Sequence, residues 1–264
     1  MTMTLKDLVL LLPCLFYLSV NGDLNDDLSR GLYLNNESMV IRAYQASSGN
    51  DIQFSHYPED CAEYYLTGYK YDGIYEIWPR EDGGGWTVFQ KRGDYTPLVD
   101  FYRTWLEYKR GFGDLERQYW LGNDRLSMLT NQDSYRLRID LEDFDRQKRF
   151  AVYHSFSVSN ELDKYRMSLG MYLNGDAGDS LYIQNDQRFS TKDQDNDSGV
   201  RDCAKVFNGA WWYNDCHQTN LNGGYLRGYH PTVLGTGVSW YLFRGNNYSL
   251  KSTEMKIRPI WFKP

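Results

Sequence analysis

The chain has 264 residues, a formal net charge of −6 and an aromatic content of 16%. The acidic balance leaves no basic stripe to neutralise phosphates, which argues against a nucleic-acid-binding protein. Aromatic side chains bury much area and keep a polar group, and 23 Tyr and 8 Trp therefore suit a loop-rich fold with a sugar-binding surface.

The N-terminus has the pattern of a secretory leader. Lys6 precedes an apolar run from Leu8 to Val20, and Val20-Asn21-Gly22 offers small residues for cleavage. This run is shorter than the roughly 20 residues that span a bilayer, and no later segment is apolar enough to do so. We therefore expect residues 1–22 to be a signal peptide and the mature chain to be secreted into an oxidising compartment.

The next segment, residues 23–56, is polar and has neither heptads nor a Gly-X-Y repeat. We expect it to be a linker or interaction arm. Asn36 begins a sequon within it and is a candidate for N-glycosylation.

Two helices are predicted after the linker. Four aromatic residues recur at helical spacing: Phe101, Trp105, Tyr108 and Phe112. Asn123 is placed to cap a second, short helix that buries Leu126 and Leu129.

Two strands follow these helices. Apolar and charged residues alternate from Tyr135 to Glu142, which predicts a half-buried strand. Phe150 to Val158 predicts a second strand, joined to the first by a hairpin through Asp145 to Lys148. Beyond Gly170 turn residues dominate and regular structure is expected to thin out, and loops of this kind carry functional sites.

One of these loops opens with three aspartates at alternate positions: Asp193, Asp195 and Asp197. Alternating carboxylates suit Ca²⁺, which takes six to eight oxygens at about 2.3–2.6 Å. An EF-hand is excluded, because Ser198 and Ala204 stand where that motif has Gly and Glu. The residues alone leave open a calcium loop of another kind or a solvated acidic turn.

The motifs along the chain resemble the fibrinogen-like domain of ficolins and of arthropod tachylectin-type lectins. In chain order they are Asp60-Cys61, DGIY (72–75), GGGWTVFQKRG (83–93), GFGDLERQYWLGNDR (111–125), LRIDLEDF (137–144), KDQDND (192–197), GAWWYNDCHQTNLNG (209–223) and EMKIRP (254–259). The resemblance implies an α+β fold over residues 57–264. That fold is a twisted antiparallel sheet with short helices and a loop-rich C-terminal calcium and ligand subdomain.

The resemblance also implies a structural Ca²⁺ ion. In this family two aspartates lie eight and six residues before the first loop cysteine, and two carbonyls lie four and two residues before it. Counted back from Cys203, these ligands are Asp195, Asp197, Gly199 and Arg201. Asp193 would lie outside the coordination shell, and two carboxylates on an exposed loop imply a Kd of about 10⁻⁴–10⁻³ M.

Acetyl-binding members of the family have a pocket beside this ion. Its parts that match here are Phe207, the Asp215–Cys216 peptide, which is cis in the family, and His217. Two tyrosine walls do not match, since Val233-Leu234 and Asn246 stand in their places. We favour recognition of an acetyl group over an altered or lost specificity.

Three cysteines remain after the leader. Cys203 and Cys216 close a short loop and are expected to pair, which stabilises the fold by ~3 kcal/mol. Cys61 then has no partner, because the strand on which family members carry its partner is missing here. It either bridges two chains or is a free thiol, which we favour. Asn247 begins another sequon and is a second candidate for glycosylation.

Two functions follow from these observations. The first is a secreted, calcium-stabilised lectin that binds N-acetylated glycans in innate immune recognition, as a single chain or a homo-oligomer. The second is a fibrinogen-like module that binds a protein ligand, with the acetyl pocket altered. An enzyme is not expected, since the sequence has neither a Gly-x-Ser-x-Gly elbow nor a His-Glu-x-x-His motif.

Overall fold

The computed structural model describes residues 85–263. Most of them form one compact unit, Val88–Gly113 with Arg117–Trp261. The predictions for the signal peptide, the linker, Asn36 and Cys61 lie outside the described residues.

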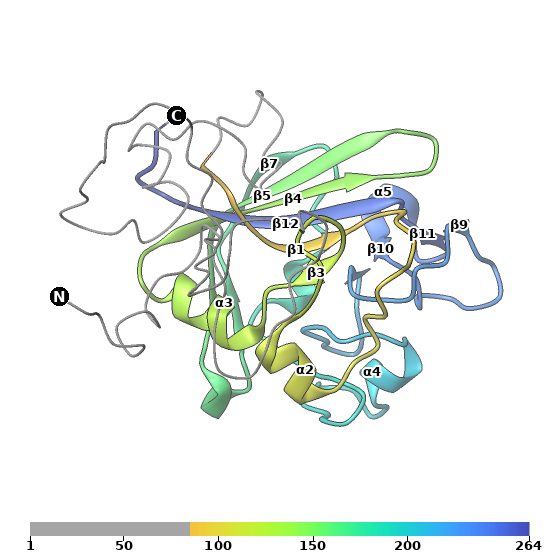
Figure 1. Cartoon of the computed structure of the whole chain (residues 1–264), viewed down its shortest axis with the longest axis horizontal. Coiled ribbons are helices and arrows are strands. Elements are labelled where there is room, and N and C mark those ends of the chain that lie inside the picture. Colours follow the sequence, from red (N-terminus) through yellow and green to blue (C-terminus); the bar gives the residue numbers. More distant parts are fainter. Residues whose placement is uncertain (1–84, 264) are drawn as a thin grey trace, which may run out of the picture. The chain divides into compact units, whose positions relative to one another are not determined.

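An eight-stranded sheet forms the framework (Figure 1). Its order is β2-β3-β1-β12-β4-β5-β6, and β7 also pairs with β5. The strands are β1 (Thr87–Arg92), β2 (Phe112–Gly113), β3 (Tyr119–Trp120), β4 (Tyr135–Glu142), β5 (Lys148–Val158), β6 (Met167–Leu169), β7 (Tyr172–Gly175) and β12 (Ser252–Pro259). The long central strands β12, β4 and β5 pair antiparallel, so the expected α+β fold with an antiparallel sheet is confirmed.

The predicted hairpin is present as β4 and β5. Buried and half-buried residues alternate along β4, and Leu137 and Ile139 are fully buried. The side chains of a strand alternate between its two faces, and the alternation in the sequence therefore marks the face that meets the core. The turn closes where Asp143 N donates to Gln147 O at 3.1 Å.

The first helix is shorter than predicted. Helix α2 spans only Trp105–Arg110, because a capping box of Thr104 and Glu107 begins it and Gly111, at φ 90°, ends it. Phe101 precedes the helix and Phe112 lies in β2. Both rings are buried and pack edge to face, with centroids 4.9 Å apart. The aromatic spacing therefore reported a shared core and not a continuous helix.

The second helix, α3 (Asn123–Thr130), buries Leu126 and Leu129 as predicted. Its predicted cap is wrong. Gly122 occupies the N-cap position, and the Asn123 side chain instead accepts a hydrogen bond from Trp120 Nε1 at 2.9 Å. A local preference for capping was overridden here by a buried indole donor that needed an acceptor.

Short elements fill most of the chain after Gly170. They are η2 (Tyr182–Gln184), α4 (Cys203–Val206), β8 (Thr219–Asn220), β9 (Gly228–Tyr229), β10 (Ser239–Trp240), α5 (Tyr241–Arg244) and β11 (Tyr248–Ser249). Strands β10 and β8 form one small sheet, and β11 and β9 form another. The eight-residue strand β12 is the exception to the expected loss of regular structure.

Buried aromatic residues hold this loop-rich region. Trp211, Trp212 and Trp240 are fully buried. The indole N–H of Trp212 donates to Tyr165 O at 2.8 Å, and that of Trp240 donates to Ala177 O at 3.0 Å. All three thus supply core packing, and Trp212 and Trp240 also supply fixed hydrogen bonds, for segments that have little secondary structure.

A buried arginine ties the same region to the sheet. Arg92 of β1 donates from Nη1 to Leu221 O and to Gly223 O, both at 3.0 Å. Its guanidinium also lies over the Phe101 ring, 3.8 Å from the centroid. Two loop carbonyls are thereby held against a rigid strand.

Candidate functional site

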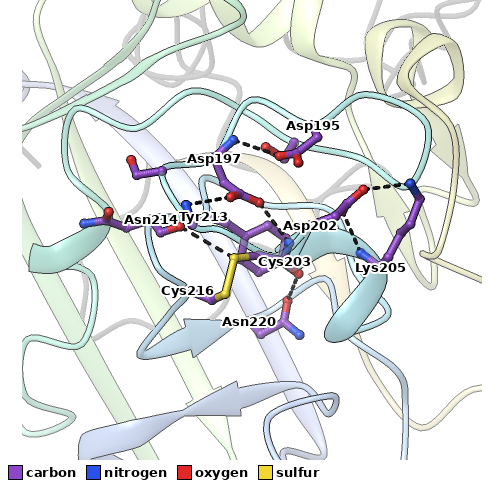
Figure 2. The surroundings of a disulfide bond; sticks show 12 residues. Asp195, Asp197, Asp202, Cys203, Lys205, Tyr213, Asn214, Cys216 and Asn220 are labelled. Atoms are coloured by element: carbon purple, nitrogen blue, oxygen red, sulfur yellow. Dashed lines mark hydrogen bonds and ion pairs between the residues drawn. A yellow bond between two sulfur atoms is a disulfide. The ribbon is translucent and has the colours of Figure 1, made fainter.

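Three carboxylates of the acidic loop, residues 193–202, lie together. Ligand oxygens of Asp195, Asp197 and Asp202 are all within 4.8 Å of one another, and Figure 2 shows them beside the disulfide. Asp197 is held by backbone donors, with Gly199 N at 2.8 Å from Oδ1 and Cys203 N at 2.9 Å from Oδ2. Burial, and to a smaller extent the charge of Asp195, raises the pKa of Asp197 to about 6.

One backbone oxygen and two carboxylate oxygens lie next to Gly199. A Cβ built on Gly199 would lie 3.2 Å from Arg201 O, from Asp197 Oδ1 and from Asp215 Oδ1. A glycine therefore leaves a small space that carbonyl and carboxylate oxygens border. All these donors are hard oxygens of the kind Ca²⁺ takes, so the residues present fit the ion.

Asp202 was missed by sequence reasoning. It lies directly before α4, where its Oδ1 accepts from Lys205 N at 3.0 Å and its Oδ2 pairs with Lys205 Nζ at 2.8 Å. In sequence it has the form of an ordinary helix N-cap. Only the folded conformation of the loop brings its carboxylate beside Asp195 and Asp197.

Asp193 accepts hydrogen bonds that hold the start of α2. Its Oδ1 accepts from Trp105 N and from Thr191 Oγ1, both at 2.8 Å. It therefore satisfies a free N–H at the start of α2 and is not part of the carboxylate cluster.

A disulfide joins this loop to the pocket. Cys203 of α4 is bonded to Cys216, with the two Cα atoms 5.8 Å apart. Cys203 is fully buried, while Cys216 lines the pocket described below. The acidic loop and the pocket are thus linked covalently.

Peptide mapping without reduction should recover a peptide pair that contains Cys203 and Cys216. We expect Cys61 either to react with iodoacetamide or to join two chains. Mass spectrometry of a non-reduced digest distinguishes these states. A bridge from Cys61 to Cys203 or Cys216 within one chain would contradict the pairing.

The pocket has a volume of about 570 Å³, a size that suits a small ligand. The four residues that the sequence proposed for a ligand site line it together: Phe207, Asp215, Cys216 and His217. The Asp215–Cys216 peptide is cis. Tyr229 and Tyr241 also line the pocket, and sequence reasoning missed them because no motif surrounds either residue.

His217 is the most distinctive group of the pocket. Its ring packs edge to face on Phe207 with centroids 4.5 Å apart. Both ring nitrogens are buried and make no well-aligned hydrogen bond among the described residues, while the Gly235 backbone lies beside Nε2 and partly opposes the effect of burial on the pKa. Burial lowers the pKa of His217 to about 4, and the neutral ring therefore presents one N–H donor and one acceptor at physiological pH.

At the two positions where the resemblance places tyrosine walls, this chain has other residues. Leu234 and Asn246 line the pocket, so these positions still border it without an aromatic ring. Tyr248, two positions beyond Asn246, is no substitute: its Oη accepts from Phe144 N at 3.0 Å beside the β4–β5 turn. Asn246 instead brings an Oδ1 atom that is buried and lacks a partner among the residues described.

Fold and site together define a ligand-binding module of the fibrinogen-like class. The family model described as the C-terminal globular domain of fibrinogen beta and gamma chains matches residues 57–260. The chain belongs to this fibrinogen C-terminal domain family, whose members are lectins and binding modules and not enzymes.

Related proteins and solved structures support the same family. The chain is 44% identical over 221 residues to Techylectin-5A of Tachypleus tridentatus, covering 78% of this chain and 75% of that one. It is 47% identical over 212 residues to Ryncolin-4 of Cerberus rynchops, covering 76% and 61%. The fibrinogen-like globe domain of human ANGPTL2 superposes with a TM-score of 0.71 at 41% identity, over 76% of this chain and 98% of that domain.

Within residues 85–263, no helix combines the length and the apolar character needed to cross a membrane.

Proposed function

We propose that this protein is a secreted, calcium-stabilised lectin that recognises N-acetylated sugars, in innate immune recognition. The observation that carries the proposal is the pocket in which Phe207 lies against a neutral His217 whose ring nitrogens make no well-aligned hydrogen bond among the described residues. An acetyl group offers a methyl for the aromatic face and a carbonyl oxygen for an N–H donor. The similarity to Techylectin-5A and Ryncolin-4 supports a lectin-type role.

Calcium would bind in the acidic loop beside the pocket and would stabilise the pocket indirectly. Asp195 and Asp197, with the carbonyls of Gly199 and Arg201, would hold the ion, and Asp202 would add a third carboxylate. The ion would supply a fixed positive charge that orders an exposed acidic loop. Through the disulfide, an ordered loop keeps Cys216 in place at the pocket.

Useful binding strength would come from several copies of the chain. A pocket for one acetyl group offers few contacts, and single-site affinity is expected to be of the order of millimolar. Linked sites raise the effective strength without any new contact. We propose a homo-oligomer for this reason, with the leader (residues 1–22) directing secretion and Asn36 as a glycosylation site.

Chromatography on N-acetylglucosamine resin tests the proposal. We expect the protein to be retained in millimolar calcium and to elute with EDTA and with free acetate. Glucosamine resin, which lacks the acetyl group, is the matched control and should not retain it. A protein that passes through both resins would contradict the lectin function.

A protein ligand is the second candidate, and the rim of the pocket favours it. Leu234 and Tyr241 both line the pocket and are 58% and 49% exposed, and Val233, next to Leu234 in the chain, is 44% exposed. Exposed apolar side chains gathered at one place mark contact surfaces for partners. Asn247 also lines the pocket, so a glycan on that sequon would cover part of it. Failure on every acetylated ligand, with calcium stabilisation intact, would favour this candidate.

A further inference from the structure

The amide side chain of Asn246 gives the pocket a polar wall where the resemblance would place an aromatic ring. Its Oδ1 atom is buried and has no hydrogen-bond partner among the residues described. A buried acceptor without a donor is unfavourable in the free protein and is satisfied by a ligand that brings an N–H or O–H group. The buried oxygen therefore indicates that the ligand brings a hydrogen-bond donor.

The backbone fixes where Asn246 stands. Its carbonyl accepts from Gly235 N at 2.9 Å, and Gly245, at φ 72°, ends helix α5 directly before it. Gly235 itself also lines the pocket. A Cβ on Gly235 would lie 2.9 Å from Phe207 Cε1 and 3.2 Å from His217 Nε2. Asn246 thus belongs to the same rigid frame as the aromatic and the histidine.

The unpartnered atoms of this frame define a ligand by its donors and acceptors. Neutral His217 offers one donor and one acceptor, and Asn246 Oδ1 offers a further acceptor. An acetamide group has a carbonyl acceptor and an adjacent N–H donor. An acetate ester of the same shape has acceptors only, and it would leave Asn246 Oδ1 buried without a partner.

We propose that Asn246 makes the pocket selective for N-acetyl over O-acetyl groups, by accepting a hydrogen bond from the acetamide N–H. This inference rests on the proposed function, because it concerns the same pocket. It goes beyond that function by assigning the choice between amide and ester to one residue. The expected preference is at least tenfold, since sites built to pair a polar ligand atom reject analogues that leave the site unpaired.

The inference is tested with two sugars that differ only in the group between C2 and the acetyl carbon, which is N–H in one and O in the other. They are methyl 2-acetamido-2-deoxyglucoside and methyl 2-O-acetylglucoside, titrated against the full chain in millimolar calcium by ligand-observed NMR. We expect at least tenfold stronger binding of the acetamide. Asn246→Leu, which keeps the size and removes the acceptor, should bring the two affinities within about threefold of each other. Asn246→Asp, which keeps acceptor oxygens, should retain the preference.

Controls separate the possible failures. Asn174→Leu makes the same change on the exposed edge of β7, outside the pocket, and should leave the preference unchanged. Each variant should keep the thermal shift on calcium addition, which shows that it is folded. Equal binding of both sugars by the parent protein would overturn the inference and leave acetyl recognition standing. Preference that survives in Asn246→Leu, or disappears in Asn246→Asp, would also overturn it. Binding of neither sugar would overturn the proposed function and this inference with it.

Discussion

Replacing His217 with alanine is expected to abolish retention on N-acetylglucosamine resin. The imidazole supplies a buried N–H that makes no well-aligned hydrogen bond to any other residue in the range 85–263, and its loss leaves the ligand carbonyl without a donor. Phe207→Ala should have the same effect for a different reason, because it removes the aromatic face that packs on His217 at 4.5 Å. We expect each change to weaken binding at least tenfold.

The controls for this prediction are a distant histidine and the metal. His154 is exposed on β5, outside the pocket, and His154→Ala should be retained like the parent protein. The calcium-dependent rise in melting temperature should persist in both pocket variants, because neither residue belongs to the carboxylate cluster. Undiminished retention of His217→Ala would show that the sugar binds elsewhere.

Removing the charge of Asp197 is expected to eliminate the stabilisation that calcium provides. Millimolar calcium at a site with a Kd of ~10⁻⁴ M stabilises the folded state by RT ln(1 + [L]/Kd), about 1.4 kcal/mol. For a domain of this size that corresponds to a melting temperature about 3–6 °C higher with calcium than with EDTA. Asp197→Asn should reduce this difference to near zero, and because its NH2 group cannot accept from Gly199 N or Cys203 N, it should also lower the melting temperature equally with calcium and with EDTA.

Asp193→Ala is the matched control for the loss of a loop carboxylate. Because Asp193 accepts from Trp105 N, its removal leaves the start of α2 without one partner and should lower stability by about 1 kcal/mol. The loss should be the same in calcium and in EDTA. Differential scanning calorimetry in both conditions measures the two effects. A parent protein whose melting temperature ignores EDTA would contradict the calcium site.

Local patterns were read correctly where one face of an element meets the core. The alternation in Tyr135–Glu142 and the apolar spacing of Leu126 and Leu129 depend only on neighbours in the chain, and both were confirmed. The predicted extent of α2 also depended only on local spacing, and it was wrong. Phe101 and Phe112 lie at helical spacing from Trp105, but a capping box and a glycine confine the helix between them. Spacing shows which residues are buried together, and caps decide where a helix begins and ends.

The candidate site divides in a similar way. The sequence by itself determined the family, the acidic loop, the spacing of its aspartates from Cys203, and the residues around Cys216, because these are contiguous motifs. Only the tertiary structure placed Asp202 with the other carboxylates and set Tyr229 and Tyr241 around His217, whereas the resemblance had already placed Asn246 at the pocket. Those residues come from short elements whose positions depend on buried tryptophans and on loop carbonyls held by Arg92. Packing between distant segments has no local signature, so the unpartnered oxygen of Asn246 becomes visible only in the folded chain.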